Sequence, residues 1–591
     1  MKAAGINTVR REIPIIFLLY SLANFLFLIH NGIVVDDWYN NLIGDDAIIY
    51  HNLAGGRPWF GYAALPIFPL DDIFSGTAVY LHRIFVFTFF FISAVLFNRI
   101  LARIEEITPH ARFVMTLFFA TLPYFNAKIF VSMWLYPFCY MIFFLAFYLL
   151  PYRQNAAVRL LSLLLFSLSF LVQSFLAFFG LVFIYFLYEK KEEAFEIYKN
   201  RKFRPGFVEI GWKIIRRQPD YFFLPFIIWF LQRTFYPPFG EYSSYNAITA
   251  HTLLKAPLVM LVTFFNTPFE TVVVPLKYLI NGSGLTVLAA ALLSGLIYFA
   301  VHKLGGNKWK EGKGSTDSVF ILFGLFAFFL AIFPYAVAGK AVPSLLSWAN
   351  KNYLLMPAGM SFLLYYGLSR FTALLKPSAR RIVMATACSI LPALFIVYSA
   401  TYWIEYNIAW FKQLALVENY RQSQTVREND IFLMVDTTTD LNAMDRANFL
   451  FYEYMGPLNI AYPGMVKFAA HADTYKRLQA GKTRLHERFT AGGFGYEGSN
   501  YYLKDFSLNK PVYYLVIKKG SLKVAGLWDV IDLKLLQFSD EKSFKAKILK
   551  FISIETIKLE EWKNSKWKDF NIPQPELSIL EKLKRKVTSS S

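Results

Sequence analysis

The chain has 591 residues, of which 56% are hydrophobic and only 17% are charged. A soluble protein cannot hide that much apolar surface, and apolar runs of about twenty residues, the length that crosses a bilayer, recur along the chain. The formal net charge of +20 does not indicate nucleic-acid binding, because the basic residues gather in short segments between the apolar runs. Both cysteines, Cys139 and Cys388, lie in apolar runs, so we expect neither a disulfide framework nor a thiolate metal cluster. Composition therefore predicts an α-helical polytopic membrane protein, with membrane lipids as partners and no nucleic acid.

The N-terminal segment predicts the orientation of the chain. Residues 1–12 are short and basic, which favours the cytoplasmic side. The apolar run 13–35 is too long for a removable signal peptide, and no small-residue cleavage site follows it. We interpret this run as the first span, which delivers the loop 36–79 to the outer face. This loop contains six aspartates and a single basic residue, Arg57.

Basic loops between the later apolar runs mark further returns to the inner face. The run 158–188 is too long for one span and is broken only at Gln173-Ser174, so it predicts a tight hairpin. The run 251–280 contains three prolines and leaves an interfacial segment, a re-entrant loop and a hairpin all open. Single spans are predicted at 80–97, 113–125, 129–150, 221–235, 285–301, 319–338, 353–368 and 382–402. The tally is about eleven spans, or about thirteen with the extra hairpin, with the N-terminus inside and the C-terminus outside.

The character of the chain changes after residue 402. Residues 403–424 predict an amphipathic helix that leaves the membrane, and the runs 431–435 and 511–517 predict strands. We therefore expect a transmembrane domain at 1–402 and an extracytoplasmic α/β or α+β domain at 403–591. Asp436, directly after the first predicted strand, is interpreted as a turn former.

Two short motifs stand in the predicted first outer loop. Asp36 and Asp37 leave the first span together, where ionised carboxylates are costly unless they are needed, and Trp38 follows them. Gly56, Arg57 and Pro58 come about twenty residues later, before the chain re-enters lipid. The loop is therefore the first place to look for chemistry.

The placement of these motifs resembles the GT-C class of membrane glycosyltransferases. Within that class the chain looks most like the type II glucosyltransferases that decorate O-antigen from lipid-linked sugar. Asp36-Asp37-Trp38 matches the acidic pair that opens the first outer loop of the class, and Gly56-Arg57-Pro58 matches the Gly-Arg-Pro that follows it. The resemblance implies transfer of a sugar from a polyprenyl-phosphate donor to a glycan, lipid or protein acceptor. It also implies that transfer takes place on the extracytoplasmic face of the inner cell membrane.

Such a transfer needs a base for the acceptor hydroxyl and cations for the leaving phosphate. We expect Asp36 or Asp37 to be the base, and the sequence does not rank them. The other carboxylate would orient the acceptor or bind a divalent cation, Mg²⁺ or Mn²⁺, as in some members of the class. Asp45 and Asp46 are the rival pair, although capping a short helix is the simpler role for them.

The phosphate contacts should come from basic residues near the outer face. Arg57 is the first choice, and Arg233, Lys340 and Lys351 follow it. Arg57 could equally brace its loop, and the simplest role for the two lysines is to extend from span ends toward water.

Two other functions fit the same features. A transporter or flippase of lipid-linked saccharides would also have many spans and basic loops, but we find few charges at mid-membrane depth and no internal repeat. A saccharide polymerase or ligase of the same fold would differ only in its acceptor, which the sequence does not specify.

Overall fold

The computed structural model describes residues 3–34, 37–38, 49, 52–59, 77–193, 203–243, 247–305, 314–443, 449–465, 467–479 and 510–570. The chain divides into two compact units. The first, which we call the helical unit, consists of Met1–Leu28 and Ile49–Ala400. The second, which we call the sheet unit, consists of Ile29–Ile48 and Thr401–Ser591. The segment that follows the first helix thus groups with the C-terminal part of the chain.

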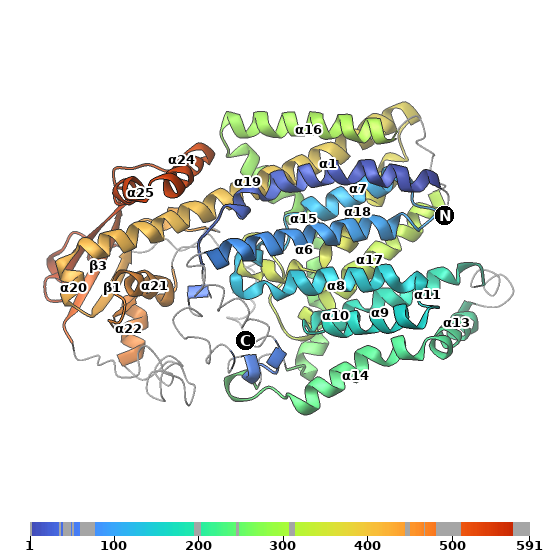
Figure 1. Cartoon of the computed structure of the whole chain (residues 1–591), viewed down its shortest axis with the longest axis horizontal. Coiled ribbons are helices and arrows are strands. Elements are labelled where there is room, and N and C mark those ends of the chain that lie inside the picture. Colours follow the sequence, from blue (N-terminus) through green and yellow to red (C-terminus); the bar gives the residue numbers. More distant parts are fainter. Residues whose placement is uncertain are drawn as a thin grey trace. The chain divides into compact units, whose positions relative to one another are not determined.

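The helical unit is built from long apolar helices that run alongside one another (Figure 1). α17 packs on α18 and on α15, while α6 packs on α1, α7 and α8. The helices of this unit are α1 (Ala3–Leu28), α6 (Thr77–Leu101), α7 (Pro109–Thr121), α8 (Leu135–Leu149), α9 (Ala156–Ser169), α10 (Ser174–Phe178), α11 (Gly180–Glu189), α13 (Phe203–Arg217), α14 (Pro219–Phe235), α15 (Ala250–Ile280), α16 (Gly284–Gly305), α17 (Gly314–Val337), α18 (Met356–Thr372) and the first part of α19 (Pro377–Gln422).

Seven stretches of the described residues are long and apolar enough to cross a membrane, by length and composition. They are Arg11–Leu28, Val79–Leu101, Val131–Tyr152, Ala250–Ile280, Gly284–His302, Asp317–Val337 and Pro377–Gln422. The predicted runs at 113–125, 221–235 and 353–368 form α7, α14 and α18, which have 13, 17 and 17 residues and are shorter than these. The helices support a polytopic membrane protein.

The predicted hairpin at 158–188 is interrupted close to the expected position. α9 ends at Ser169 and α10 begins at Ser174, so the break lies beside the polar pair Gln173-Ser174. Phe166 of α9 meets Phe179, which follows α10, with ring centroids 4.9 Å apart. The chain therefore folds back on itself here, as a hairpin requires.

The run 251–280, for which the sequence left three alternatives open, forms α15 (Ala250–Ile280), one continuous helix of 31 residues. Thr249 caps its first turn, and Pro257, Pro268 and Pro275 lie within it. Each proline removes one backbone hydrogen bond, which a membrane helix tolerates when its neighbours satisfy the exposed groups. A hairpin at this position is therefore wrong, and with it the tally of about thirteen spans.

The sheet unit contains a mixed four-stranded sheet in the order β2-β1-β3-β4. Its strands are β1 (Ile431–Asp436), β2 (Phe468–Ala470), β3 (Val512–Lys519) and β4 (Ile552–Lys558). β1 is parallel to β2 and to β3, whereas β4 is antiparallel to β3. β1 is buried along its whole length, which explains its unbroken apolar sequence. The two predicted strands are thus confirmed as β1 and β3.

Helices pack around this sheet. They are α20 (Gln424–Glu428), α21 (Phe451–Ala461), α22 (Ala472–Gln479), α24 (Leu527–Ser539) and α25 (Glu541–Ile548). The later part of α19 also belongs here, since α19 continues without interruption through 46 residues. Phe411 of α19 packs against Phe544 of α25, and Asn419 donates to the carbonyl oxygens of Leu549 and Ile552. The predicted amphipathic helix at 403–424 is therefore a structural part of the sheet unit.

Candidate active site

Trp38 anchors the segment that follows the first helix. Its side chain is completely buried, and its indole Nε1 donates a hydrogen bond to Oε1 of Gln413 at 2.9 Å. The ring also lies against Trp410, with centroids 6.1 Å apart. Both partners are on the sheet-unit part of α19. Trp38 is therefore fixed by one apolar contact and one neutral hydrogen bond.

Two glycines leave the space that this pair of tryptophans fills. A Cβ at Gly456 of α21 would lie 2.1 Å from a ring carbon of Trp38, and a Cβ at Gly32 would lie 2.5 Å from Trp410. These separations are far below a van der Waals contact, so any larger residue must displace an indole ring. We call Gly32, Trp38, Trp410, Gln413 and Gly456 the tryptophan clasp.

Asp37 is held next to the clasp. Its side chain is 5% exposed, and its amide donates to the carbonyl oxygen of Val34 at 3.0 Å. The other candidate acids, Asp36, Asp45 and Asp46, lie outside the described residues. Asp37 is thus the candidate base whose position is known, and the clasp determines where it sits.

Arg57 lies in a tight turn of the helical unit. Gly56 has φ +69°, a conformation that favours glycine, and the amide of Arg57 donates to the carbonyl oxygen of Asn52 at 2.8 Å. The amide of Phe239 donates to Ala54 at 3.0 Å, which joins this turn to the chain after α14. Glycine at 56 is thus required by the turn, and the turn sets the position of the guanidinium.

Arg57, Lys340 and Lys351 come together in the helical unit. Burial, followed by the positive charges of Lys351 and Arg57, lowers the pKa of Lys340 to about 8. All three side chains are half-buried. We call these three residues the cation cluster. Arg57 and Lys351, predicted separately from Lys340 as phosphate ligands, are therefore both close enough to Lys340 to repel its charge.

Asparagines hold Lys351 from both sides. Asn350 accepts a hydrogen bond from the backbone amide of Asn126, and Asn352 donates to the carbonyl oxygen of Ala341 at 3.0 Å. Such contacts fix the backbone at the lysine itself. Lys351 therefore projects from an anchored turn.

Glu270 anchors the rest of the segment that carries the two lysines, residues 338–353. Its carboxylate accepts from the amide of Leu345 at 2.8 Å and from the hydroxyl of Ser344 at 3.1 Å. The hydroxyl of Tyr353 donates to it at 3.4 Å. We did not predict this positioning residue from the sequence. The available signal was that Glu270 is the sole acid in the apolar run 251–280.

The remaining predicted ligands are not brought to this cluster by any contact of the described residues. Arg233 is exposed on the last turn of α14. No group of three His, Cys, Asp or Glu side chains in the described part of the chain is arranged to hold a metal ion. Because Asp36 lies outside that part, the predicted cation site at Asp36 and Asp37 stays a prediction.

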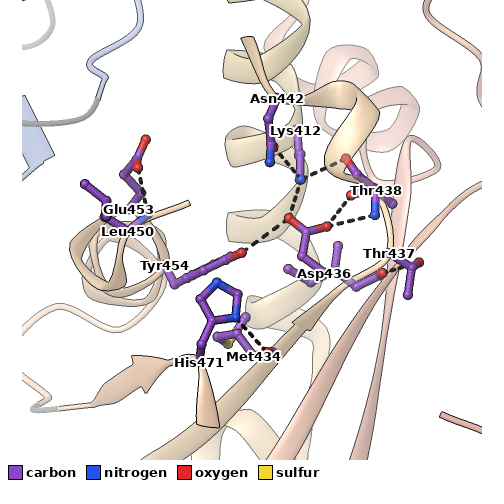
Figure 2. Close-up of polar contacts among 11 residues, drawn as sticks. Lys412, Met434, Asp436, Thr437, Thr438, Asn442, Leu450, Glu453, Tyr454 and His471 are labelled. Atoms are coloured by element: carbon purple, nitrogen blue, oxygen red, sulfur yellow. Dashed lines mark hydrogen bonds and ion pairs between the residues drawn. The ribbon is translucent and has the colours of Figure 1, made fainter. Parts of the chain in front are cut away.

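A second polar centre lies in the sheet unit (Figure 2). Lys412 of α19 donates to the carboxylate of Asp436 at 2.6 Å and to the side chain of Asn442 at 2.7 Å. Asp436 also accepts from the amide and the hydroxyl of Thr438, at 2.9 and 2.7 Å, and from Tyr454 at 3.3 Å. Both charged side chains are fully buried. Burial opposes ionisation of Asp436, but the charge of Lys412 and the Thr438 contacts outweigh it and lower its pKa.

This centre joins α19 to the end of β1. The contact of Asp436 with the amide of Thr438 is the turn-forming role predicted for it, and the ion pair with Lys412 adds a second role. His471, at the end of β2, lies near Tyr454 and contacts the carbonyl oxygen of Met434 at 3.2 Å. Because the ionised groups are already saturated with hydrogen bonds, we interpret the centre as structural.

Comparison with protein-family models, with curated proteins and with solved structures finds no match to this chain.

Proposed function

We propose that the chain is a multi-pass glycosyltransferase of the inner membrane. It would move a sugar from a polyprenyl-phosphate donor to an acceptor on the extracytoplasmic face, with the N-terminus in the cytoplasm. The observation that carries this proposal is the convergence of Arg57, Lys340 and Lys351.

The positive charges of Arg57 and Lys351 near Lys340 would attract an anion. Like charges brought together cost free energy, and an anion between them would recover it. Phosphate suits this set, because a guanidinium can bind two phosphate oxygens side by side while ammonium groups act as point charges. A phosphate in a membrane protein of this kind is most simply the head of a lipid, whose tail would lie against the apolar helices.

We propose Asp36 or Asp37 as the base of the reaction on the strength of its sequence motif alone. The oxygen of an acceptor hydroxyl attacks the anomeric carbon of the sugar, and its proton passes to the carboxylate of Asp36 or Asp37. The bond between the anomeric carbon and the phosphate oxygen breaks, and its electron pair leaves with the polyprenyl phosphate. The cation cluster would stabilise the charge that develops on that oxygen.

Transfer assays with acid-pair variants test the proposal. Membranes containing the wild type, Asp36→Asn or Asp37→Asn are supplied with radiolabelled polyprenyl-phosphate sugars. Asp440→Asn, an exposed carboxylate of the sheet unit, is the matched control. We expect one of the two variants to lose transfer while donor binding and expression persist, and the control to retain it.

Two results would contradict the proposal. Full transfer by both acid-pair variants would show that neither Asp36 nor Asp37 is the base. Movement of labelled lipid across the bilayer without transfer by the wild type, over several donors, would favour the transporter instead.

A further inference from the structure

α24 in the sheet unit carries a stripe of apolar side chains on its outer surface. Trp528, Leu535 and Phe538 are 67%, 64% and 61% exposed, and Ile531 is partly exposed between them. Their spacing of three, four and three residues aligns them on one side of the helix. The side chains that face the sheet unit are Val530, Leu533 and Lys534. We call Trp528, Ile531, Leu535 and Phe538 the α24 stripe.

The buried face of α24 is linked to the chain where it leaves the first membrane helix. Lys534 donates a hydrogen bond to the side chain of Asn31, and its ammonium lies 5.2 Å from the ring of Phe411. Asn31 comes three residues after Leu28, the last residue of α1 and of the first candidate span. Three residues of extended chain reach only about 10 Å. If α1 crosses the bilayer, Asn31 therefore lies close to the bilayer surface, and Lys534 of α24 is hydrogen-bonded to it.

Basic side chains surround this helix. Lys523, Lys542 and Lys550 are exposed, and the amide of Leu522 donates to the carbonyl oxygen of Lys550, which brings two of these lysines close together. The acidic Asp532 on α24 is paired with Lys547. Exposed lysines beside an apolar stripe complement the anionic headgroups of a bilayer.

We propose that α24 is an interfacial helix that docks the sheet unit on the lipid surface. The α24 stripe enters the headgroup region, where tryptophan is a preferred residue, and the neighbouring lysines meet anionic lipid. The occupant of the stripe is thus lipid rather than a second copy of the chain or another part of it. The inference rests on the membrane character of the helical unit and not on the sugar-transfer reaction.

Spin labels on the full-length protein measure what covers the stripe. Cys139 and Cys388 are buried and are replaced by alanine, which leaves a background without cysteine. Ile531→Cys, Leu535→Cys and Phe538→Cys are each spin-labelled in nanodiscs that contain phosphatidylglycerol. Asp529→Cys, an exposed position of α24 that is not on the stripe, is the matched control. Collision rates are measured with oxygen, which concentrates in lipid, and with a water-soluble nickel chelate.

We expect all three stripe labels to collide more with oxygen than with nickel, and the control to show the reverse. Higher nickel collision at the stripe, equal to that of the control, would overturn the proposal because the stripe would then face water. Low collision with both reagents would also overturn it, because protein would then cover the stripe.

Discussion

The tryptophan clasp contains Trp38 of the first motif, and the cation cluster contains Arg57 of the second. Different forces hold these two regions. The clasp fixes Trp38 and the adjacent Asp37 by ring packing, by the absence of side chains at Gly456 and Gly32, and by a neutral hydrogen bond. The cluster brings Arg57 together with Lys340 and Lys351 against their mutual repulsion. A proton-accepting carboxylate needs a fixed position, whereas a phosphate site needs positive charge. Changes of shape should therefore affect the first region and changes of charge the second.

The largest expected effect comes from the buried ion pair of the sheet unit, Lys412 and Asp436, which belongs to neither region. Lys412→Met leaves Asp436 buried without its cation, which typically costs about 3–5 kcal/mol. We expect a much lower unfolding temperature of the sheet unit, measured in detergent by intrinsic fluorescence. The double variant Lys412→Met/Asp436→Leu should recover much of the loss. If Lys412→Met were as stable as the wild type, the ion pair of Lys412 with Asp436 would not stabilise the sheet unit.

Gly456→Ala tests the shape of the clasp. Its new Cβ collides with the Trp38 ring, and such overpacking typically costs about 1–3 kcal/mol. If Asp37 acts in catalysis, the variant should lose turnover while its affinity for donor stays near the wild-type value. Gly295→Ala is the control, because a Cβ there meets no atom within 4 Å. Equal turnover in both variants would show that the clasp does not position the acid.

Lys340→Gln tests the charge of the cluster. We expect donor to bind roughly ten-fold more weakly, which corresponds to about 1.4 kcal/mol. Lys340→Arg should restore most of the affinity, since it restores the charge. Lys376→Gln, at an exposed lysine of the predicted cytoplasmic face, should bind donor like the wild type. If Lys340→Gln bound donor as tightly as the wild type, the cation cluster would not be the donor-binding site.

The smallest effect is a dependence on pH. Because the pKa of Lys340 is about 8, its positive charge is lost as the pH rises through that value, and donor binding should weaken there. The stability of the donor-free protein should change in the opposite direction. The folded lysine releases its proton at a lower pH than the unfolded one, so stability rises with pH above about 8. Titrations of donor affinity and of unfolding temperature, each compared with Lys340→Gln, check the two signs.

Local patterns in the sequence were sufficient for much of the fold. Apolar runs of helical length predicted most helices, and the polar pair Gln173-Ser174 marked the break in 158–188. β1 and β3 were predicted because their side chains are apolar and flanked by turns. β2 has only three residues, Phe468–Ala470, and is too short to give a pattern. α15 was uncertain because proline normally ends a helix in water, whereas it is tolerated within a membrane bundle.

Contacts between distant residues could not be predicted in the same way. Trp38 meets Gln413 across 375 positions, and Glu270 reaches Leu345 across 75. Nothing near Asp37 in the sequence indicates that its segment belongs to the sheet unit. The cation cluster was different, because charge near predicted span ends already suggested each of its members. Residue type therefore predicted the candidates, and only the fold shows which of them meet.

Photocrosslinking tests the central claim most directly. A polyprenyl-phosphate sugar with a diazirine close to the phosphate is irradiated with the protein in nanodiscs, and the modified peptides are identified by mass spectrometry. We predict crosslinks to the peptides that contain Arg57 and residues 338–353, and their loss when excess unlabelled donor is present. Crosslinks that are competed by donor but lie entirely outside these two segments would contradict the assignment of the cation cluster to the donor phosphate.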